Sequence, residues 1–370
     1  MKTEQILQKL ISIKSFSRQE DDIQKFIFKF IKSYNLKPLF VGKNVVVKIK
    51  GKDTKSCLIF NSHVDTVSAG NLALWQTSPF SGFINGGEIY GLGSSDEKAS
   101  VAVSLKLIEM FSGKVPDCDL WITFVANEEV DGSGTKEFIK WFGKNHKNEY
   151  QNIAGILGEP TKLEKTEIGH KGNLFIKAIA IGDSGHGSEP QKIKKHAIKL
   201  IYKFINKLDS EANLWKMKYK NEFLGIPTIS LTAITGGDVS SPNKFADTCL
   251  AVFDIRTTPE VHEKAFGLIS KIAKDMNQAI KIEFLYSPAS YGFTNADEKI
   301  VKIVKKVTNT NLFASFGSND MCFFTEVGIP AIVFGPGEPS CIHKPNEYCE
   351  IENLDKCVVF YKEIIKEYSL

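Results

Sequence analysis

The chain has 370 residues, of which 42% are hydrophobic and 24% are charged, so it is long enough to bury a core and to form two domains. The 47 Lys and Arg residues against 43 Asp and Glu residues give a net charge of +4, which is too balanced to indicate a surface for nucleic acid or membranes. There is no apolar run of about 20 residues and no signal-peptide pattern, and the seven cysteines form no CxxC pair. We therefore expect a globular protein of the cytoplasm with reduced thiols.

Helices and strands alternate in the first part of the chain. Such an alternation favours a mostly parallel sheet with helices on its faces. The apolar periodicity predicts helices near 3–13, 18–34, 97–112 and 134–143, and strands near 44–50, 56–62, 119–126 and 153–158.

The order of elements changes in the middle of the chain. Two helices, near 192–208 and 260–277, lie among strands near 173–181, 228–234, 248–255 and 280–286. This βαββαβ order is typical of a ferredoxin-like α+β unit. The alternating pattern then returns, with helices near 297–308, 319–327 and 353–368 and a strand near 331–335. We predict an α/β domain formed by residues 1–172 and 287–370, interrupted by an inserted α+β domain at 173–286.

The segment "FNSHVDTV", at 60–67, ends an apolar run with a histidine and a carboxylate. Residues two apart on an extended chain share a face, so His63 and Asp65 point the same way out of the strand end. A buried, satisfied histidine and a turn-capping aspartate are the alternatives for either residue alone.

More polar residues follow other predicted strands or precede a helix. Asp96 follows a glycine-rich turn, where the alternative is a helix N-cap. The others are Glu128 and Glu129 after "LWITFVAN", Glu159 after "GILG", and His343 after "FGPGEPSCI". Two histidines and three carboxylates make a mixed ligand set that suits zinc or a similar divalent ion, and one carboxylate can bridge two ions. Asp65 can then orient His63, while Glu128 stays unligated as a general base.

Five segments, "SHVDTV", "GLGSSDEK", "ANEEVDGSGT", "GEPT" and "GPG…H", resemble in order and approximate spacing the dinuclear zinc amidohydrolases and peptidases of the M20 family. That family includes succinyl-diaminopimelate desuccinylase, acetylornithine deacetylase, aminoacylase and glutamate carboxypeptidases. The resemblance covers nearly the whole chain. It implies a zinc-binding α/β domain with an inserted lid that often serves for dimerisation.

The resemblance also implies two divalent ions, zinc with cobalt as an alternative. One ion would lie on His63, Asp96 and Glu159, and the second on Glu129, His343 and the same Asp96.

Glu128 would take a proton from the water shared by the ions, giving a metal-bridged hydroxide, and would later deliver that proton to the leaving amine. Family members with glutamate at the position of Glu159 tend to be deacylases and carboxypeptidases, which favours deacylation.

The predicted lid carries further candidates through the same resemblance. His186, in "GDSGHGSEP", corresponds to the lid histidine that polarises the scissile carbonyl and in dimers reaches the neighbouring subunit's site; a loop histidine without function is the alternative. Asn243 and Arg256 correspond to residues that meet the substrate, and the planar fork of Arg256 matches a carboxylate. Gly317 and Ser318 correspond to a turn beside the substrate, against the alternative of an ordinary loop.

Two positions depart from the family pattern. Ala99 follows Asp96-Glu97-Lys98 where most relatives have glycine, and Gly187 stands where many members have serine. Neither change removes a predicted ligand.

We therefore expect a deacetylase or desuccinylase that hydrolyses the amide bond of N-acylated amino acids. A carboxypeptidase or dipeptidase on the same site is the alternative, and its substrate is a short peptide. A non-catalytic binding or scaffold protein is a different class, which the presence of Glu128 and all five ligands disfavours. The expected partners are the small-molecule substrate and a second copy of the chain, bound through the lid, with no nucleic acid and no membrane.

Overall fold

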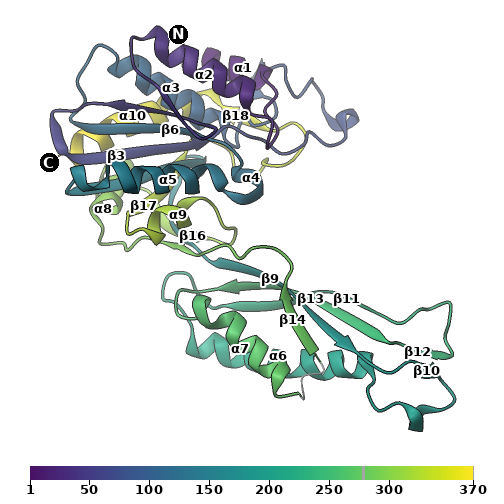
Figure 1. Ribbon diagram of the computed structural model, residues 1–370. Coiled ribbons are helices and arrows are strands. Elements are labelled where there is room, and N and C mark those ends of the chain that lie inside the picture. The colour runs from purple at the N-terminus through teal and green to yellow at the C-terminus, as the bar shows by residue number, and fades with distance from the viewer. Residues whose placement is uncertain (277–279, 370) are drawn as a thin grey trace. The chain divides into compact units, whose positions relative to one another are not determined.

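The computed structural model describes residues 1–276 and 280–369 and divides into two compact units (Figure 1). The first, called the α/β unit, comprises Met1–Gly169, Gly292–Ala314 and Asn319–Leu370. The second, called the inserted unit, comprises His170–Tyr291 and Ser315–Ser318.

The described part of the α/β unit contains one nine-stranded mixed sheet. Its centre is formed by the neighbouring parallel strands β6 (Cys118–Val125), β3 (Asp53–His63), β7 (Asn152–Pro160) and β17 (Ala331–Gly335). Antiparallel strands flank this centre, so the predicted parallel arrangement is confirmed for the central strands. The flanking strands are β1 (Leu39–Val41) and β2 (Asn44–Ile49) beside β6, and β8 (Lys165–His170), β15 (Gly292–Phe293) and β16 (Asn311–Ser315) beyond β17.

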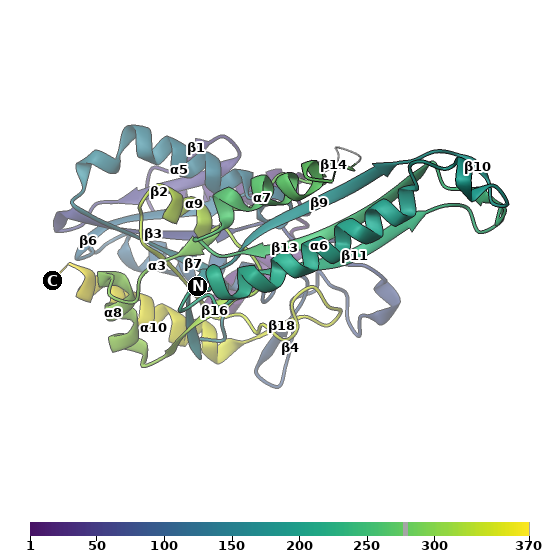
Figure 2. The ribbon, with the colours of Figure 1, turned by 90° about the horizontal axis from the view of Figure 1, so that it is seen from below.

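Helices cover both faces of this sheet (Figures 1 and 2). One layer consists of α1 (Thr3–Ser12), α2 (Asp21–Ser33), α3 (Lys98–Phe111), α8 (Lys299–Thr308) and α10 (Ile351–Tyr368). The other consists of α5 (Ser133–Asn145) and α9 (Met321–Glu326).

Successive residues of β3 bury their side chains on opposite faces of the sheet. Ile59 belongs to the core cluster that contains Phe138 of α5 and Phe324 of α9. The ring of Phe60 packs on that of Tyr361 in α10, with 4.9 Å between the ring centroids. A strand buried on both faces reads as a continuous apolar run, which is the pattern that predicted it.

Several short elements were not predicted, because three or four residues carry little periodicity. They include β1, β15, the strands β4 (Phe83–Asn85), β5 (Glu88–Tyr90) and β18 (Tyr348–Glu350), which form a small antiparallel sheet, the helix α4 (Glu128–Asp131), and the 3₁₀ turns Leu72–Leu74 and Lys147–Glu149. The longer strands β8 and β16 were not predicted either.

The inserted unit has the predicted βαββαβ order. Its described residues form an antiparallel sheet in the order β11-β13-β9-β14, and α6 and α7 pack side by side on one face (Figure 2). The last residue of the helix predicted at 260–277 lies outside the described residues. The elements are β9 (Gly172–Ile181), β10 (Gly185–His186), the 3₁₀ turn Pro190–Lys192, α6 (Ala197–Lys218), β11 (Thr228–Gly236), β12 (Lys244–Phe245), β13 (Thr248–Thr257), α7 (His262–Lys274) and β14 (Ile280–Phe284).

Helix α6 begins later and ends later than the predicted range 192–208. It starts after His196, whose side chain accepts a hydrogen bond from the first turn and so caps the helix. It extends beyond 208 because the buried stripe continues at helical spacing through Leu208, Ala212 and Trp215.

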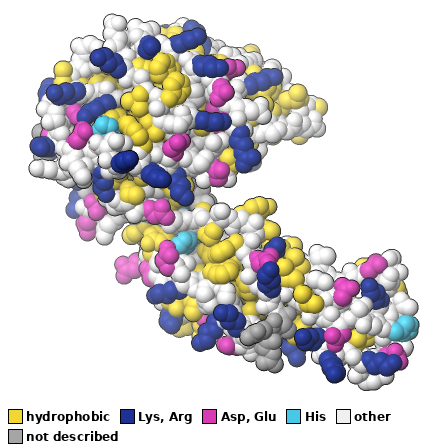
Figure 3. Space-filling model, in the orientation of Figure 1, with side chains coloured by type: hydrophobic (Ala, Val, Ile, Leu, Met, Phe, Trp, Pro, Cys, Tyr) yellow, Lys and Arg dark blue, Asp and Glu magenta, His cyan; other side chains and the backbone are white. Residues whose placement is uncertain are grey.

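None of the helices in the described ranges combines the length and the apolar character that crossing a membrane requires. On the face shown in Figure 3, Lys and Arg side chains are scattered among acidic and uncharged ones rather than gathered in one patch.

Candidate metal centre

The predicted ligands lie where the central parallel strands end. His63 is the last residue of β3, Glu129 follows β6, and Glu159 lies near the end of β7. His343 lies in the loop after β17. Because the carboxyl ends of adjacent parallel strands meet at one edge of a sheet, these four side chains share that edge.

Asp96 lies between two histidines. Its Oδ1 atom is 2.9 Å from Nε2 of His63, and its Oδ2 atom is 3.5 Å from Nε2 of His343. Glu159 places Oε1 at 3.7 Å from the same nitrogen of His63, and Glu129 places Oε2 at 3.0 Å from that of His343. The structure thus brings together all five residues predicted as ligands.

These separations suit a metal ion. Ligand atoms placed 2.0–2.1 Å from a tetrahedral ion lie about 3.3 Å from one another. His63, Asp96 and Glu129 offer atoms within 4.8 Å of one another, and so do His63, Glu128 and Glu159. Glu128 therefore lies within range of an ion as well, and its role as a base rather than a ligand stays a prediction.

Among the described residues, the carboxylates of the cluster have no lysine or arginine to balance their charge. No Lys or Arg in the described ranges forms an ion pair with Glu128, Glu129, Glu159 or Asp96. Burial, together with Asp320 for Glu128 and Asp96 for Glu159, raises the pKa of both carboxyl groups well above the usual range. Divalent cations would relieve this repulsion, so the donor set fits two such ions.

The two histidines differ in exposure. The side chain of His63 is 1% exposed and that of His343 is 50% exposed, so solvent reaches the cluster from the side of His343. Burial favours neutral His63, but hydrogen bonds with Asp65 and Asp96 outweigh it and raise its pKa. The hydrogen bond with Glu129 raises the pKa of His343.

Asp65 is buried and connects His63 with the segment after β6. Its carboxylate accepts hydrogen bonds from Oγ of Ser17 at 2.7 Å and from the backbone N–H groups of Glu128 at 3.1 Å and Glu129 at 3.3 Å. One of its oxygens lies 3.5 Å from Nδ1 of His63. Burial opposes ionisation, but His63 and these donors hold the pKa of Asp65 below its usual range.

The two residues after Asp96 are buried. Glu97 accepts a hydrogen bond from the backbone N–H of His63 at 3.2 Å, and its Oε1 atom has no hydrogen-bond partner among the described residues. Burial, with Asp96 as a further cause, raises the pKa of Glu97 to about 8. The ammonium group of Lys98 donates to the backbone oxygens of Leu10 and Ile13, and so attaches this segment to the end of α1. Neither residue was predicted as a ligand or as a catalytic residue.

A close approach of β7 to the start of α3 requires a glycine before Glu159. A Cβ atom on Gly158 would lie 2.2 Å from Oε1 of Glu97 and 2.3 Å from Cβ of Ser100. Any side chain at position 158 would therefore displace the segment that follows Asp96.

Sequence reasoning also missed Glu347. Its carboxylate accepts hydrogen bonds from the backbone N–H groups of Gly93, Ser95 and Asp96, at 2.9, 2.8 and 2.9 Å. Burial raises its pKa to about 7, although these donors favour the ionised form. Glu347 follows no long strand, so the pattern that pointed to the other carboxylates is absent here; its spacing of four residues from His343 was the available signal.

In the inserted unit, His186 and Asn243 lie on neighbouring chain segments. His186 in β10 pairs with Lys244 in β12, and the backbone N–H of Gly187 donates to the backbone oxygen of Asn243 at 2.6 Å. The imidazole is exposed, and its Nδ1 atom lies 2.7 Å from Oγ of Ser188. The structure therefore brings together these two candidates, which are far apart in the sequence.

Arg256 directs its guanidinium fork at Asp254. Nε lies 2.8 Å from Oδ1 and Nη2 lies 3.0 Å from Oδ2 of that residue. The third nitrogen is 3.5 Å from the backbone oxygen of Phe316, which precedes the predicted substrate turn of Gly317 and Ser318. The fork predicted to meet a substrate carboxylate thus faces a carboxylate of the protein itself.

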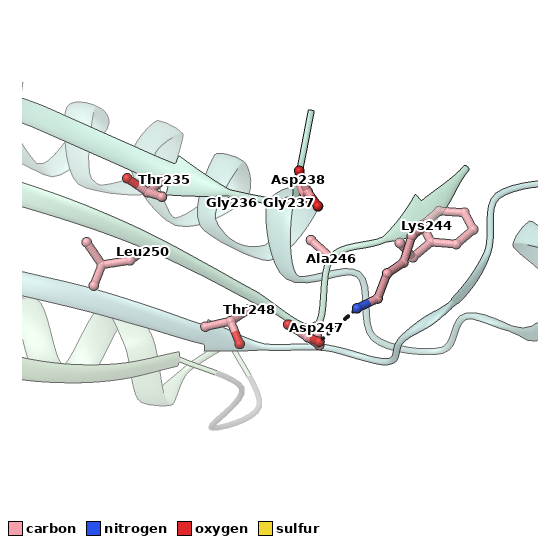
Figure 4. Close-up of a pocket in the computed structure, with 10 residues that line it drawn as sticks. Thr235, Gly236, Gly237, Asp238, Lys244, Ala246, Asp247, Thr248 and Leu250 are labelled. Carbon is pink, nitrogen blue, oxygen red and sulfur yellow. Dashed lines mark ion pairs between the residues drawn. The ribbon is translucent and has the colours of Figure 1, made fainter. Parts of the chain in front are cut away.

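A pocket of about 330 Å³ lies elsewhere in the inserted unit, between the end of β11 and the start of β13 (Figure 4). Lys244 and Asp247 form an ion pair of 3.6 Å at this pocket. None of the predicted site residues lines it. Its lining consists of Thr235, Gly236, Gly237, Asp238, Lys244, Phe245, Ala246, Asp247, Thr248 and Leu250.

The chain is similar to known proteins over most of its length. The chain is 29% identical to an acetylornithine deacetylase of Buchnera aphidicola over 79% of this chain and 76% of that protein. It is 27% identical to a succinyl-diaminopimelate desuccinylase of Blochmanniella floridana over 99% and 98% of the two chains. Among solved structures, a tripeptidase of Staphylococcus aureus shares the fold, with a TM-score of 0.75, 20% identity, and coverage of 100% of this chain and 98% of that chain.

The profile of Peptidase family M20/M25/M40 matches residues 59–367, a span that includes every predicted metal ligand. The chain belongs to this family of metallohydrolases.

Proposed function

We propose that this protein is a metal-dependent amidohydrolase that removes an acyl group, such as acetyl or succinyl, from the nitrogen of an amino acid. The observation that carries the proposal is Asp96, whose two oxygens face His63 and His343 at 2.9 and 3.5 Å. The acetylornithine deacetylase and succinyl-diaminopimelate desuccinylase among its relatives support this substrate class.

In this proposal His63, Asp96 and Glu159 hold one divalent ion, and Glu129, His343 and Asp96 hold a second. Zinc suits this mixed set of imidazole and carboxylate ligands, and cobalt is the alternative. When bound, the two ions supply Lewis acidity, which lowers the pKa of water and polarises the scissile carbonyl.

Glu128 acts as the general base. Its carboxyl group lies beside the ligands in a partly buried setting that raises its pKa, so it can take a proton from water and keep it until the amine leaves. The hydrogen bond from its backbone N–H to Asp65 fixes the start of α4, and thus the direction of the side chain. Asp65 also orients His63, so one buried carboxylate positions a ligand and the base.

The inserted unit serves as a lid and as the surface for dimerisation. Strand β11 is an edge strand, exposed along most of its length, and an exposed edge favours pairing with another chain. Exposed apolar side chains accompany it on β11 and α6, among them Leu231, Ile234, Tyr202, Leu214 and Met217. These features support a homodimer formed through this unit.

The same unit would supply groups to the substrate. His186 would donate to the oxyanion that forms from the scissile carbonyl, in the partner's site if the dimer places it there. Asn243, Gly317 and Ser318 would contact the substrate. Arg256 would do so only after exchanging Asp254 for a substrate carboxylate.

A peptidase that cleaves dipeptides, or removes a carboxy-terminal residue, is the alternative. The fold that the chain shares with the S. aureus tripeptidase favours it, and the metal centre would serve both reactions.

All seven cysteines are buried and free, which supports action in the reducing cytoplasm.

The test is a comparison of turnover of N-acetylornithine, N-succinyl-diaminopimelate and N-acetyllysine with turnover of dipeptides, using protein loaded with zinc or cobalt. Protein carrying Glu128→Gln serves as the blank. We expect the best N-acyl amino acid to exceed every dipeptide in kcat/KM. Faster cleavage of a dipeptide would overturn the deacylase proposal in favour of a peptidase.

A further inference from the structure

We infer that Glu347 is a positioning residue that holds the bridging carboxylate Asp96 in place for both ions, an inference that rests on the proposed dinuclear site. Among the described residues, the only hydrogen bond between the side chain of Glu347 and a predicted ligand is the one from the backbone N–H of Asp96. Its action on the ions is therefore indirect.

The carboxylate of Glu347 is a buried acceptor for the turn that carries Asp96. Glu347 is 2% exposed, and three N–H groups, from Gly93, Ser95 and Asp96, point at its two oxygens at 2.8–2.9 Å. Gly93 adopts a φ of +76°, a backbone conformation that glycine takes without strain. Three hydrogen bonds to one buried carboxylate fix the conformation of the turn, because each N–H group would otherwise lose its buried acceptor.

Glu347 also joins the turn to the loop that carries His343. Its backbone oxygen accepts from the N–H of Gly91 at 2.9 Å, and Oγ of Ser95 donates to the backbone oxygen of Glu338 at 2.9 Å. The loop is therefore hydrogen-bonded to the turn and its flanking residues through Glu338 and Glu347, which lie on either side of His343 in the sequence. The distance between His343 and Asp96, and hence the spacing of the two ligand sets, depends on these contacts.

The chemistry of the contact requires a carboxylate of this length. All three backbone partners are hydrogen-bond donors. The NH₂ group of a glutamine is also a donor, so it could not accept a hydrogen bond from the backbone N–H that it would face. An aspartate keeps the charge but is one methylene shorter, so it cannot reach all three N–H groups, and an unpaired buried N–H is costly. Glu347→Gln and Glu347→Asp thus perturb the turn in different ways.

Glu338 provides a matched control. It lies in the same loop and is 6% exposed, but its carboxylate pairs with Nζ of Lys162 at 2.8 Å and accepts from the N–H of Ser340 at 2.9 Å. In the described ranges, Glu338 is hydrogen-bonded to the turn through its backbone oxygen, and Glu338→Gln leaves that oxygen in place.

The experiment measures zinc affinity directly, by competition with a chromophoric chelator, on metal-free wild-type protein and on the Glu347→Gln and Glu338→Gln variants. Loss of a partner that orients a metal ligand typically costs about 10–100-fold in affinity, which we expect for Glu347→Gln. Glu338→Gln should stay within about 3-fold of wild type, well short of that range. The absorption spectrum of the cobalt-loaded protein should shift in Glu347→Gln and not in Glu338→Gln.

A purely structural role for Glu347 predicts a different result: a lower melting temperature of the metal-free protein, with unchanged zinc affinity and cobalt spectrum. That result, or equal loss of affinity in both glutamine variants, would overturn the inference. If Glu347→Gln fails to fold, the same measurement is made on Glu347→Asp. We expect this variant to bind zinc more weakly than wild type, and wild-type affinity would overturn the inference. Wild-type protein that binds two ions but hydrolyses no N-acyl amino acid would overturn the proposed function alone.

Discussion

The backbone N–H of Glu128 donates a hydrogen bond of 3.1 Å to Oδ1 of Asp65. The proposed base is therefore anchored by the carboxylate that also lies 3.5 Å from Nδ1 of His63. Since the backbone makes this contact, the side chain of Glu128 can be changed without loosening the anchor.

Glu128→Gln should keep both metal ions and lose most turnover. An amide cannot accept the proton of water, and general acid–base groups contribute roughly 10²–10⁴-fold to rates. Metal content, measured by elemental analysis, should stay at the wild-type value while kcat falls. Loss of an ion together with activity would instead make Glu128 a ligand, as its place in the cluster with His63 and Glu159 allows.

Asp65→Asn should weaken both metal binding and catalysis. The amide nitrogen would replace one of the two oxygens and so face the N–H group of either Glu128 or Glu129, and the charge that favours the orientation of His63 would be lost. We expect zinc affinity to fall about 10–100-fold. Ser17→Ala is the comparison, because it removes one donor to Asp65 and leaves the carboxylate intact; an equal loss in both variants would contradict the orienting role.

Much of the fold and of this site could be predicted, because strand ends in α/β sheets follow from apolar runs and the residues after them. His63, Glu129 and Glu159 each follow a buried run, so their shared edge could be foreseen. The pairing of Arg256 with Asp254 could not, because both residues lie on the same strand face and nothing in the sequence says which partner the guanidinium takes.

Glu347 and the full range of α6 could not be predicted from the sequence, for other reasons. Glu347 acts on backbone N–H groups, which leave no mark on the residue pattern, and its three donors become neighbours only when the turn at 93–96 is formed. The range of α6 was misjudged because the apolar spacing weakens near Asp209 and Ser210 and resumes at Ala212. Tertiary burial, not local propensity, carries the helix across that interval.

Removal of metal should destabilise the α/β unit. The carboxylates of Asp96, Glu129 and Glu159 then repel one another in a partly buried setting, and an ion that binds only the folded chain stabilises it by mass action. Zinc at 100 times its dissociation constant adds about 2.7 kcal/mol to the free energy of unfolding. Differential scanning calorimetry of chelated and zinc-loaded protein should show the increase in melting temperature; the same melting temperature in both samples would contradict metal binding at this cluster.

His186→Ala should reduce kcat and leave metal content intact. Donors aimed at a developing oxyanion are worth about 10²–10³-fold in rate, and His186 is remote in sequence from every metal ligand. If His186 acts in the partner's site, mixing the His186→Ala and Glu128→Gln proteins should restore activity, because some hybrids contain one intact composite site. No recovery despite demonstrated subunit exchange would place His186 in its own subunit's site or outside catalysis.

We propose that Asp96 bridges two divalent ions held by His63, His343, Glu129 and Glu159. The most direct measurement is the number of zinc ions bound per chain at equilibrium, by dialysis of metal-free protein against zinc followed by elemental analysis. We predict two ions per wild-type chain and the loss of tight binding of both in Asp96→Ala. A wild-type chain that binds no zinc, or an Asp96→Ala chain that still binds two ions tightly, would show that Asp96 does not bridge two ions in this protein.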